Sequence, residues 1–435
     1  MRKTVALSIA AFSLMTTVHA AEDLSSMFTE GKVSGQIRSF YIDRDYMGAV
    51  ETHRSATAIG GHLKFETADF HGLSVGAAFY TTNKVLDGLE LDTFDPTLFG
   101  TGGDSYAMLG ELYLQYTFGN TILKVGRQKL DTPMAGSDDA RMLPNLFEAY
   151  VAINKDIPDT TLIAAHVTKF APGTFANAYN GGVLGATAGY TAIPGNTAIH
   201  QGEFTDMGQW AVGQNTEGVS VLSATYTGVE NLKLQLWDYY AWDILNAVYG
   251  QADFSWNCLL TDKVKPYAAL QFIKEDDVGD SLTVGNVDAF YWGAKVGAKF
   301  GGANVYVAYS ENDSDSSSFA NGALISPWGG MPAFTQGMVT RHQFLAGTDA
   351  WKVAGSYNWK DLGVNLSTTL YYAEFDVPND TGYGTSRTAK EPGFDVIYYP
   401  EFVKNLQLRF RGNFPNEFSN NLDWDEYRFI VNYNF

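Results

Sequence analysis

Apolar and polar residues alternate along most of this chain, in segments of about ten residues that are separated by turn-forming residues. In residues 232–237 and 406–411, three apolar residues alternate with Lys, Gln, Trp or Arg. In residues 427–435, Tyr, Phe and Val alternate with Arg, Ile and Asn. A period of two over this length predicts β-strands that have one wet face and one apolar face.

A soluble β-sandwich and a membrane β-barrel would show the same alternation, so the residues at the strand ends are needed to distinguish these two classes. Tyr, Phe and Trp make up 14% of the chain, and the last residue is the aromatic Phe435. Aromatic residues at strand ends are typical of the girdles of outer-membrane barrels. The pattern therefore predicts an all-β fold, a transmembrane antiparallel β-barrel.

Short turns and long polar stretches alternate between the predicted strands. The eight short turns are at residues 69–72, 119–120, 155–159, 228–231, 260–263, 301–302, 360–361 and 400–405. The longest polar stretches are residues 84–105, 171–217 and 311–350. Eight short turns and nine longer connections predict about eighteen strands, with the short turns at one end of the barrel and the long loops at the other.

The first twenty residues have the pattern of a secretory signal. Arg2 and Lys3 precede an apolar run, and Val18 and Ala20 are small residues at the positions that a signal peptidase recognises. We therefore expect a signal peptide at residues 1–20 and a single barrel domain at residues 21–435. No segment offers the roughly 20 continuous apolar residues that a membrane helix needs, so the sequence excludes a helical membrane protein.

Charge and cysteine content narrow the class further. Removal of two basic residues with the signal leaves 27 basic and 48 acidic residues, a net charge of −21. Such acidity argues against nucleic acid as a partner, because phosphate binding needs a basic face. The single cysteine, Cys258, cannot form an intramolecular disulfide, so stability must come from elsewhere, and a closed sheet is one source.

The stretch 124–150 leaves one strand, crosses a polar loop with two prolines and enters the next strand. It resembles the OprD family of outer-membrane porins, a resemblance carried by Gly126-Arg127-Gln128, Leu130-Asp131-Thr132-Pro133, Asp138-Asp139-Ala140-Arg141-Met142, Pro144-Asn145, Gln36-Ile37-Arg38-Ser39-Phe40-Tyr41, Pro327-Trp328-Gly329-Gly330, Pro332-Ala333-Phe334 and Tyr427-Arg428. The resemblance implies an eighteen-stranded, substrate-selective channel of Gram-negative bacteria, with the third and seventh outer loops folded inward. It also implies a column of basic residues that guides carboxylate-bearing solutes.

Alternation independently supports part of that column. In the first predicted strand, Val33, Ile37 and Tyr41 share one face. Arg38 therefore points the other way, into water. The last strands place Arg409, Arg411 and Arg428 opposite apolar residues in the same manner. Because the first and last strands of a closed barrel are neighbours, we expect these four arginines on one side of the lumen. The alternative is that lumenal arginines only pair with loop carboxylates and fill space.

The remaining candidate site residues lie in or beside the central loop. Asp138, Asp139 and Arg141 would face the basic column from an inward-folded constriction loop, although a solvated acidic turn is an equal alternative.

The strand before this loop carries two further candidates. Alternation places Lys124 in the lumen. Arg127 shares a face with Leu123 and Val125, which predicts an outward position, and only a bulge at Gly126 would turn it inward as the resemblance requires. The inward position of residues 327–334 rests on the resemblance alone, and a surface lid would fit the pattern equally.

These observations predict a passive, substrate-selective porin without a cofactor. We expect small anionic or zwitterionic solutes (amino acids, short peptides or organic acids) as cargo. Outer-membrane lipid, lipopolysaccharide and, through the strand ending at Phe435, the barrel-assembly machinery are the expected partners. The alternatives are a general non-selective porin, an adhesin or structural barrel, and a barrel enzyme.

Catalytic and metal-binding patterns are weak. The histidines are scattered without metal spacing or a nucleophile context, so we expect no enzyme. The acidic run at residues 311–315 has oxygen ligands that a calcium ion could use, but a solvated loop is its more usual fate.

Overall fold

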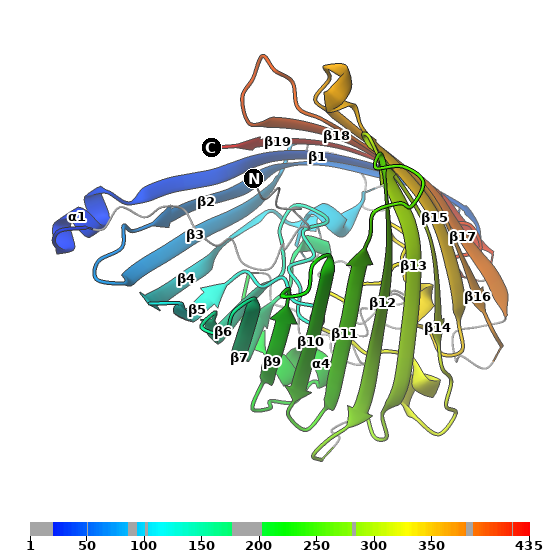
Figure 1. The fold of residues 1–435 in the computed structure, drawn as a ribbon, viewed down its shortest axis with the longest axis horizontal. Coiled ribbons are helices and arrows are strands. Elements are labelled where there is room, and N and C mark those ends of the chain that lie inside the picture. Colours follow the sequence, from blue (N-terminus) through cyan, green and yellow to red (C-terminus); the bar gives the residue numbers. More distant parts are fainter. Residues whose placement is uncertain are drawn as a thin grey trace.

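A closed antiparallel barrel forms the whole of the described chain (Figure 1). The computed structural model describes residues 21–49, 51–85, 94–100, 103–175, 202–280, 284–379, 386–419 and 421–435, so the predicted signal at residues 1–20 lies outside them. Eighteen long strands of the described residues make the wall. A nineteenth strand, β8, has two residues and pairs only with the end of β7.

The strands are β1 (Lys32–Gly48), β2 (Thr52–Glu66), β3 (Leu73–Lys84), β4 (Tyr106–Phe118), β5 (Thr121–Gln128), β6 (Leu146–Asn154), β7 (Thr160–Ala171), β8 (Thr205–Asp206), β9 (Val219–Tyr226), β10 (Leu232–Ala241), β11 (Leu245–Ser255), β12 (Val264–Asp277), β13 (Asp288–Phe300), β14 (Ala303–Asn312), β15 (Asp349–Asn358), β16 (Leu366–Val377), β17 (Arg387–Tyr398), β18 (Leu406–Asn413) and β19 (Leu422–Asn434). The helices are short: α1 (Leu24–Thr29), α4 (Met207–Val212), η1 (Pro96–Leu98), η3 (Phe319–Gly322), η4 (His342–Phe344) and η5 (Trp359–Leu362). Within the described residues, no helix is long and apolar enough to cross a membrane.

Pairing of the first and last long strands closes the sheet. β1 and β19 run antiparallel, from Gln36 opposite Asn434 to Gly48 opposite Leu422. Every other long strand pairs with its neighbours in the sequence, except that β7 pairs with β9 across the short β8. Closure leaves no row of unpaired backbone groups, which is the condition for a sheet to cross hydrocarbon. The predicted eighteen-stranded barrel is confirmed.

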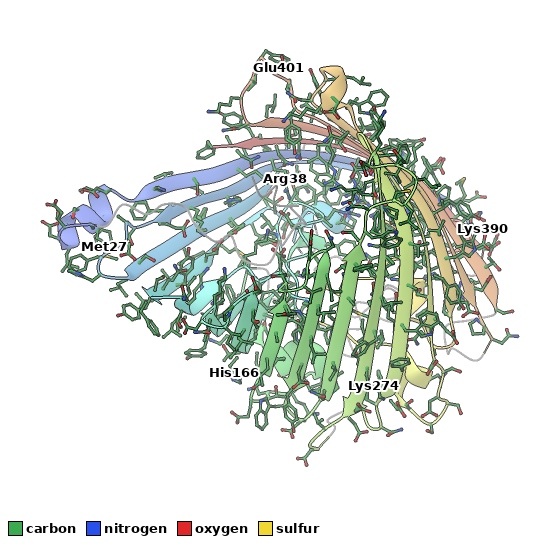
Figure 2. All side chains as sticks on the ribbon, in the orientation of Figure 1. Met27, Arg38, His166, Lys274, Lys390 and Glu401 are labelled. Atoms are coloured by element: carbon green, nitrogen blue, oxygen red, sulfur yellow. The ribbon has the colours of Figure 1, made fainter. Side chains whose placement is uncertain are left out.

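Turn lengths define the two ends of the barrel. All eight predicted short turns lie between consecutive strands, and the predicted long stretches join β3 to β4, β7 to β9 and β14 to β15. In Figure 2, Met27 in α1 and Glu401 in the β17–β18 turn lie at the short-turn end, while Lys274 and Lys390 lie toward the long-loop end. In outer-membrane barrels the short turns face the periplasm.

Side chains alternate across the wall as the sequence predicts. Leu234 and Leu236 on β10 are 40% and 51% exposed on the outer face, whereas Trp237 and Tyr239 on the same strand are buried on the inner face. The outer face presents leucine, valine and aromatic residues, as a lipid-facing surface requires.

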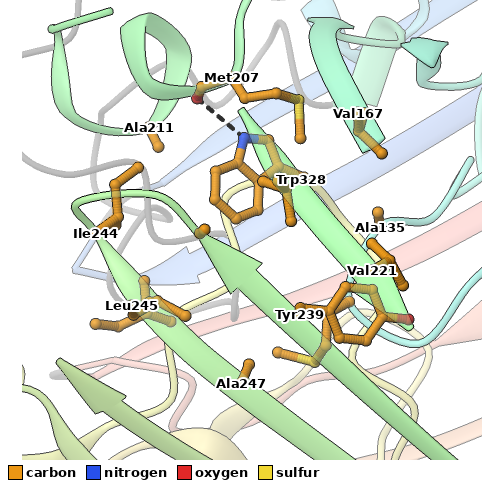
Figure 3. Packing of buried hydrophobic residues seen from close by; sticks show 14 of the residues in the cluster. Ala135, Val167, Met207, Ala211, Val221, Tyr239, Ile244, Leu245, Ala247 and Trp328 are labelled. Carbon is orange, nitrogen blue, oxygen red and sulfur yellow. Dashed lines mark hydrogen bonds between the residues drawn. The ribbon is translucent and has the colours of Figure 1, made fainter. Parts of the chain in front are cut away.

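Loops and strands pack together inside one part of the barrel. Trp328, from the β14–β15 connection, lies among Val221 of β9 and Tyr239 of β10, and its indole Nε1 donates a hydrogen bond to the Met207 carbonyl oxygen at 3.1 Å (Figure 3). Residues from β6, β7, β11, β12 and β13 belong to the same cluster. The position of residues 327–334 is therefore inside the barrel, and the surface-lid alternative is wrong.

Candidate functional site

Inward-facing arginines follow three neighbouring strands, β1, β18 and β19. Arg411 of β18 lies directly opposite Arg428 of β19, and Arg38 of β1 lies opposite Asn432, four residues further along β19. Phe410 and Phe429, which flank these positions, are 41% and 47% exposed on the outer face. The strand alternation therefore points Arg38, Arg409, Arg411 and Arg428 to the inner side of one stretch of wall.

Arg38 holds the inward-folded loop between β5 and β6, residues 129–145, which we call L3. Its Nη1 is 2.6 Å from the Asp139 Oδ1 atom, and its Nε donates to the Asn432 Oδ1 atom at 2.9 Å. Arg38 Nη1 also donates to the Arg141 carbonyl oxygen. Burial raises the pKa of Asp139, but the charge and hydrogen bond of Arg38, together with Lys129 and His62, outweigh burial and hold the pKa of Asp139 below its ordinary value.

A buried carboxylate, Glu426 of β19, forms ion pairs with three arginines. Its Oε2 atom accepts from Arg44 Nε at 2.7 Å, and its Oε1 atom lies 3.4 Å from Arg141 Nη2 and in contact with Arg428 Nε. Arg44 also pairs with Asp95 at 2.9 Å. The side chains of all three arginines are at most 4% exposed. A buried charge needs such pairing to be stable, so this cluster fixes L3 and the β3–β4 connection to the wall.

Two further arginines, Arg409 and Arg411, are partly exposed to solvent. Arg409 Nε lies 2.9 Å from the Asp395 Oδ1 atom, and Arg411 Nε lies 3.6 Å from Asp395 Oδ2. The Arg409 side chain is 28% exposed and the Arg411 side chain 16%. Two guanidinium groups therefore share one carboxylate, which leaves an excess of positive charge facing the lumen.

L3 is bound to the β14–β15 connection, residues 313–348, which we call L7. Gly136 N donates to the Trp328 carbonyl oxygen at 3.1 Å, and Met331 N donates to the Pro133 carbonyl oxygen at 2.5 Å. The Asp138 carboxylate accepts from Gly330 N at 3.1 Å. The two adjacent aspartates thus differ in their contacts: Asp139 pairs with the arginine wall, whereas Asp138 joins the two inward loops.

Lys124 and Arg127 lie on opposite faces of β5. The Lys124 Nζ atom sits 3.7 Å from the centre of the inward-facing Tyr113 ring. Arg127 lies opposite the outward-facing Leu112, and the β4–β5 register shows no bulge at Gly126. The prediction of Arg127 in the basic column is therefore wrong, because strict alternation along β5 holds. Arg127 contacts Glu148 at 3.8 Å on the outer side.

Sequence reasoning missed Arg44, Asp395 and Glu426. Arg44 is six residues from Arg38 and so shares its face, a signal that the sequence did contain. The apolar Phe40 and Ile42 also point inward between them, because the loops that fold into this part of the barrel cover these residues. Apolar residues on both faces hide the alternation.

Nothing in the described residues suggests a metal site, since they contain no group of three or more His, Cys, Asp or Glu residues placed to hold an ion. In the acidic run at residues 311–315, the Asp315 carboxylate accepts hydrogen bonds from the backbone N and hydroxyl of Ser317 at 2.9 and 2.8 Å. These contacts shape the local turn.

The closed wall, the inward loops and the arginine face together define an outer-membrane porin. The family model for outer membrane porins of the OprD family matches residues 26–435, and the chain belongs to this family. The resemblance inferred from the sequence is therefore confirmed. The comparison with curated proteins gave no match.

Solved structures show the same fold. Pseudomonas aeruginosa OccK9 (OpdG) is 20% identical, with a TM-score of 0.75. P. aeruginosa OpdK with vanillate is 19% identical, with a TM-score of 0.74, and P. aeruginosa OccK2 (OpdF) with glucuronate is 17% identical, with a TM-score of 0.72. In each case the likeness covers 94% of this chain and 99% of the other.

Proposed function

We propose that this porin lets small carboxylate-bearing solutes diffuse passively through its lumen, and that Arg409 and Arg411 receive their carboxylates. The observation that carries the proposal is the pair of partly exposed guanidinium groups that share the single carboxylate of Asp395. Arginine stays charged at any physiological pH and can hold a carboxylate through two parallel hydrogen bonds. The site residues take no catalytic role in this proposal, and no energy source is needed.

The arginine face divides into two parts with different tasks. Arg44, Arg141 and Arg428 converge on Glu426 and are covered, so we assign them to anchoring the loops. Arg38 ties down L3 through Asp139, whose side chain is 33% exposed. A solute would then pass between the Asp139 side of L3 and the open arginines. Within the described residues, Arg38, Arg409 and Arg411 form ion pairs with two carboxylates, those of Asp139 and Asp395, and this local excess of positive charge raises the concentration of anions despite the negative total charge.

The ligands named for two related structures support a carboxylate as cargo. Vanillate was found with OpdK and glucuronate with OccK2 (OpdF), and both ligands are carboxylates. The two ligands differ in ring chemistry and polarity. They therefore support a carboxylate group on the solute but do not indicate the rest of its structure.

Export and assembly form part of the same proposal. Residues 1–20 would direct the chain to the periplasm. The assembly machinery would then recognise the last strand, whose Phe435 is 46% exposed on the outer side. Lipid and lipopolysaccharide would then contact the apolar outer face. The mass of the protein purified from outer membranes tests the first step, since cleavage after Ala20 predicts an N-terminus at Ala21.

Uptake into proteoliposomes tests the transport role. We expect wild-type protein to admit succinate faster than a neutral sugar of similar size. The variant with both Arg409→Ala and Arg411→Ala should slow succinate about tenfold and leave the sugar within twofold, because each lost charged hydrogen bond is worth about 1.5–3 kcal/mol, part of which water replaces. Lys360→Ala with Lys404→Ala removes two charges from exposed turns and serves as the control.

The outcomes separate the competing functions. Equal slowing of succinate and sugar would show that the arginines only shape the lumen, as in a general porin. No uptake of either solute by wild-type protein would favour an adhesin or structural barrel. Hydrolysis of lipid or peptide by the pure protein would indicate a barrel enzyme.

A further inference from the structure

A group of lysines and aromatic rings lies in the lumen on strands β12 to β14, away from the arginine face. The Lys295 Nζ atom is 4.2 Å from the centre of the Phe334 ring, 5.6 Å from that of Tyr306 and 6.0 Å from that of Tyr267. Lys299 Nζ lies 5.7 Å from the centre of the same Tyr267 ring. Two lysine ammoniums therefore lie within 6.0 Å of the centre of one phenol ring.

The backbone is arranged to leave room for these rings. Gly297 lies opposite both Tyr267 and Tyr306, between Lys295 and Lys299 on the inner face of β13. A Cβ atom at Gly297 would come within 2.5 Å of the Tyr267 ring, so a side chain here would displace that ring. The Tyr267 hydroxyl is fixed by a hydrogen bond to the Asn304 Oδ1 atom at 2.9 Å.

The charge of this group is not neutralised. Within the described residues, neither Lys295 nor Lys299 has a carboxylate within the 4.0 Å of an ion pair. The acid that acts on Lys295 is Asp253 of β11, which accepts a hydrogen bond from Gln251 Nε2 at 2.8 Å. Two ammonium groups facing one more distant carboxylate leave a net positive charge, and the lysine head groups are free to turn toward an incoming anion.

We propose that Lys295, Lys299, Tyr267, Tyr306 and Phe334 form a second solute-binding station, selective for carboxylates that carry an aromatic ring. The lysine ammoniums would bind the carboxylate, and the rings would stack against the aromatic part, for which offset and edge contacts between rings are favourable. An aliphatic carboxylate would gain only the charge contact. This proposal rests on the proposed transport of carboxylates, and it narrows the expected solutes to carboxylates that carry an aromatic ring.

The station extends from L7 toward the short-turn end of the barrel. Phe334 belongs to L7, and the Gln271 side chain of β12 donates to the neighbouring Pro332 carbonyl oxygen at 2.6 Å, which fixes this part of L7 against the same wall. Lys299 is close to the short turn at Gly301 and Gly302. A solute that has passed L7 would therefore meet Lys299 before it leaves the barrel.

Single-channel recording in planar bilayers tests the station. With benzoate and acetate as probes, wild-type protein should show benzoate dwell times several-fold longer than those of acetate. Lys295→Met should shorten the benzoate dwell time about tenfold, as expected for loss of a charge-assisted contact. Tyr267→Leu should shorten benzoate dwells several-fold and leave acetate unchanged. Lys360→Met, an exposed lysine in the turn between β15 and β16, is the control and should behave as wild type.

Further variants keep the test decisive if Lys295→Met fails to insert. Lys295→Arg keeps the charge and should keep the benzoate dwell time within about twofold, whereas Lys299→Met should shorten it. Unchanged benzoate dwells in Lys295→Met or Lys299→Met, or equal shortening of benzoate and acetate by Tyr267→Leu, would overturn the station. These results would leave the transport proposal standing, since that proposal fails only if substitution of Arg409 and Arg411 does not slow carboxylates selectively.

Discussion

Arg38 and Asp139 are 101 residues apart in the sequence and form an ion pair with a shortest distance of 2.6 Å. One residue belongs to the wall and the other to an inward loop. The pair therefore sets how far L3 stands from β1, and so contributes to the width of the passage beside it.

Acid should release this pair only at low pH. The pKa of Asp139 is lowered from its ordinary value of 3.8, so the ion pair is complete above about pH 4 and is lost as the pH falls through the lower pKa of the folded protein. We expect single-channel current noise to stay constant from about pH 7 to pH 5 and to rise below pH 4. Asp139→Asn should show the raised noise at neutral pH, and Asp361→Asn, in an exposed turn, should not. A noise increase near pH 6 in the wild type would contradict this account.

Glu426→Gln should destabilise the barrel strongly. The substitution leaves Arg44, Arg141 and Arg428 buried with too little negative charge, and breaking a buried ion pair in this way costs about 3–5 kcal/mol. Denaturant unfolding of the protein in detergent micelles measures the loss. Glu401→Gln, in an exposed turn, is the matched control. A loss below about 1 kcal/mol would mean that the cluster does not anchor the loops.

Trp328→Ala should loosen L7 and reduce stability together. Trp328 is 4% exposed and packs in the cluster of Figure 3, and truncation of a buried tryptophan costs about 3–5 kcal/mol. We expect a lower unfolding midpoint and a noisier open-channel current. Trp256→Ala removes a ring that is 39% exposed and should change neither property. A quiet channel in Trp328→Ala would show that other contacts hold L7.

Asp395→Asn should increase selectivity for anions. The substitution removes the carboxylate that Arg409 and Arg411 share. The positive charge of both guanidinium groups is then no longer offset, and the lumen becomes more positive. The permeability ratio of succinate to potassium should rise several-fold, with Asp262→Asn in an exposed turn as the comparison. A fall in this ratio would mean that Asp395 is needed mainly to position the arginines.

The wall of the barrel was predictable from the sequence because its signals are local. Alternation with a period of two identifies the lipid-facing residues, and short turns fix the order of strands. The same rule placed Arg38, Arg409, Arg411 and Arg428 on the inner face and Arg127 on the outer face. For Arg127 the strand pattern was a better guide than the family resemblance.

The contacts between loops were not predictable, because they join distant segments without a local signal. The hydrogen bond from Gly136 to Trp328 and the convergence of Arg44 and Arg141 on Glu426 depend on how L3 and L7 fold into the lumen. These contacts decide which arginines are covered and which remain open, a division that alternation cannot reveal.

The reversal potential across a bilayer that separates two concentrations of potassium succinate tests the central role of the open arginines most directly. We predict that wild-type protein favours succinate over potassium, and that the variant with Arg409→Ala and Arg411→Ala shifts the reversal potential toward that of potassium. A cation-selective wild-type channel whose reversal potential the double substitution leaves unchanged would contradict the account.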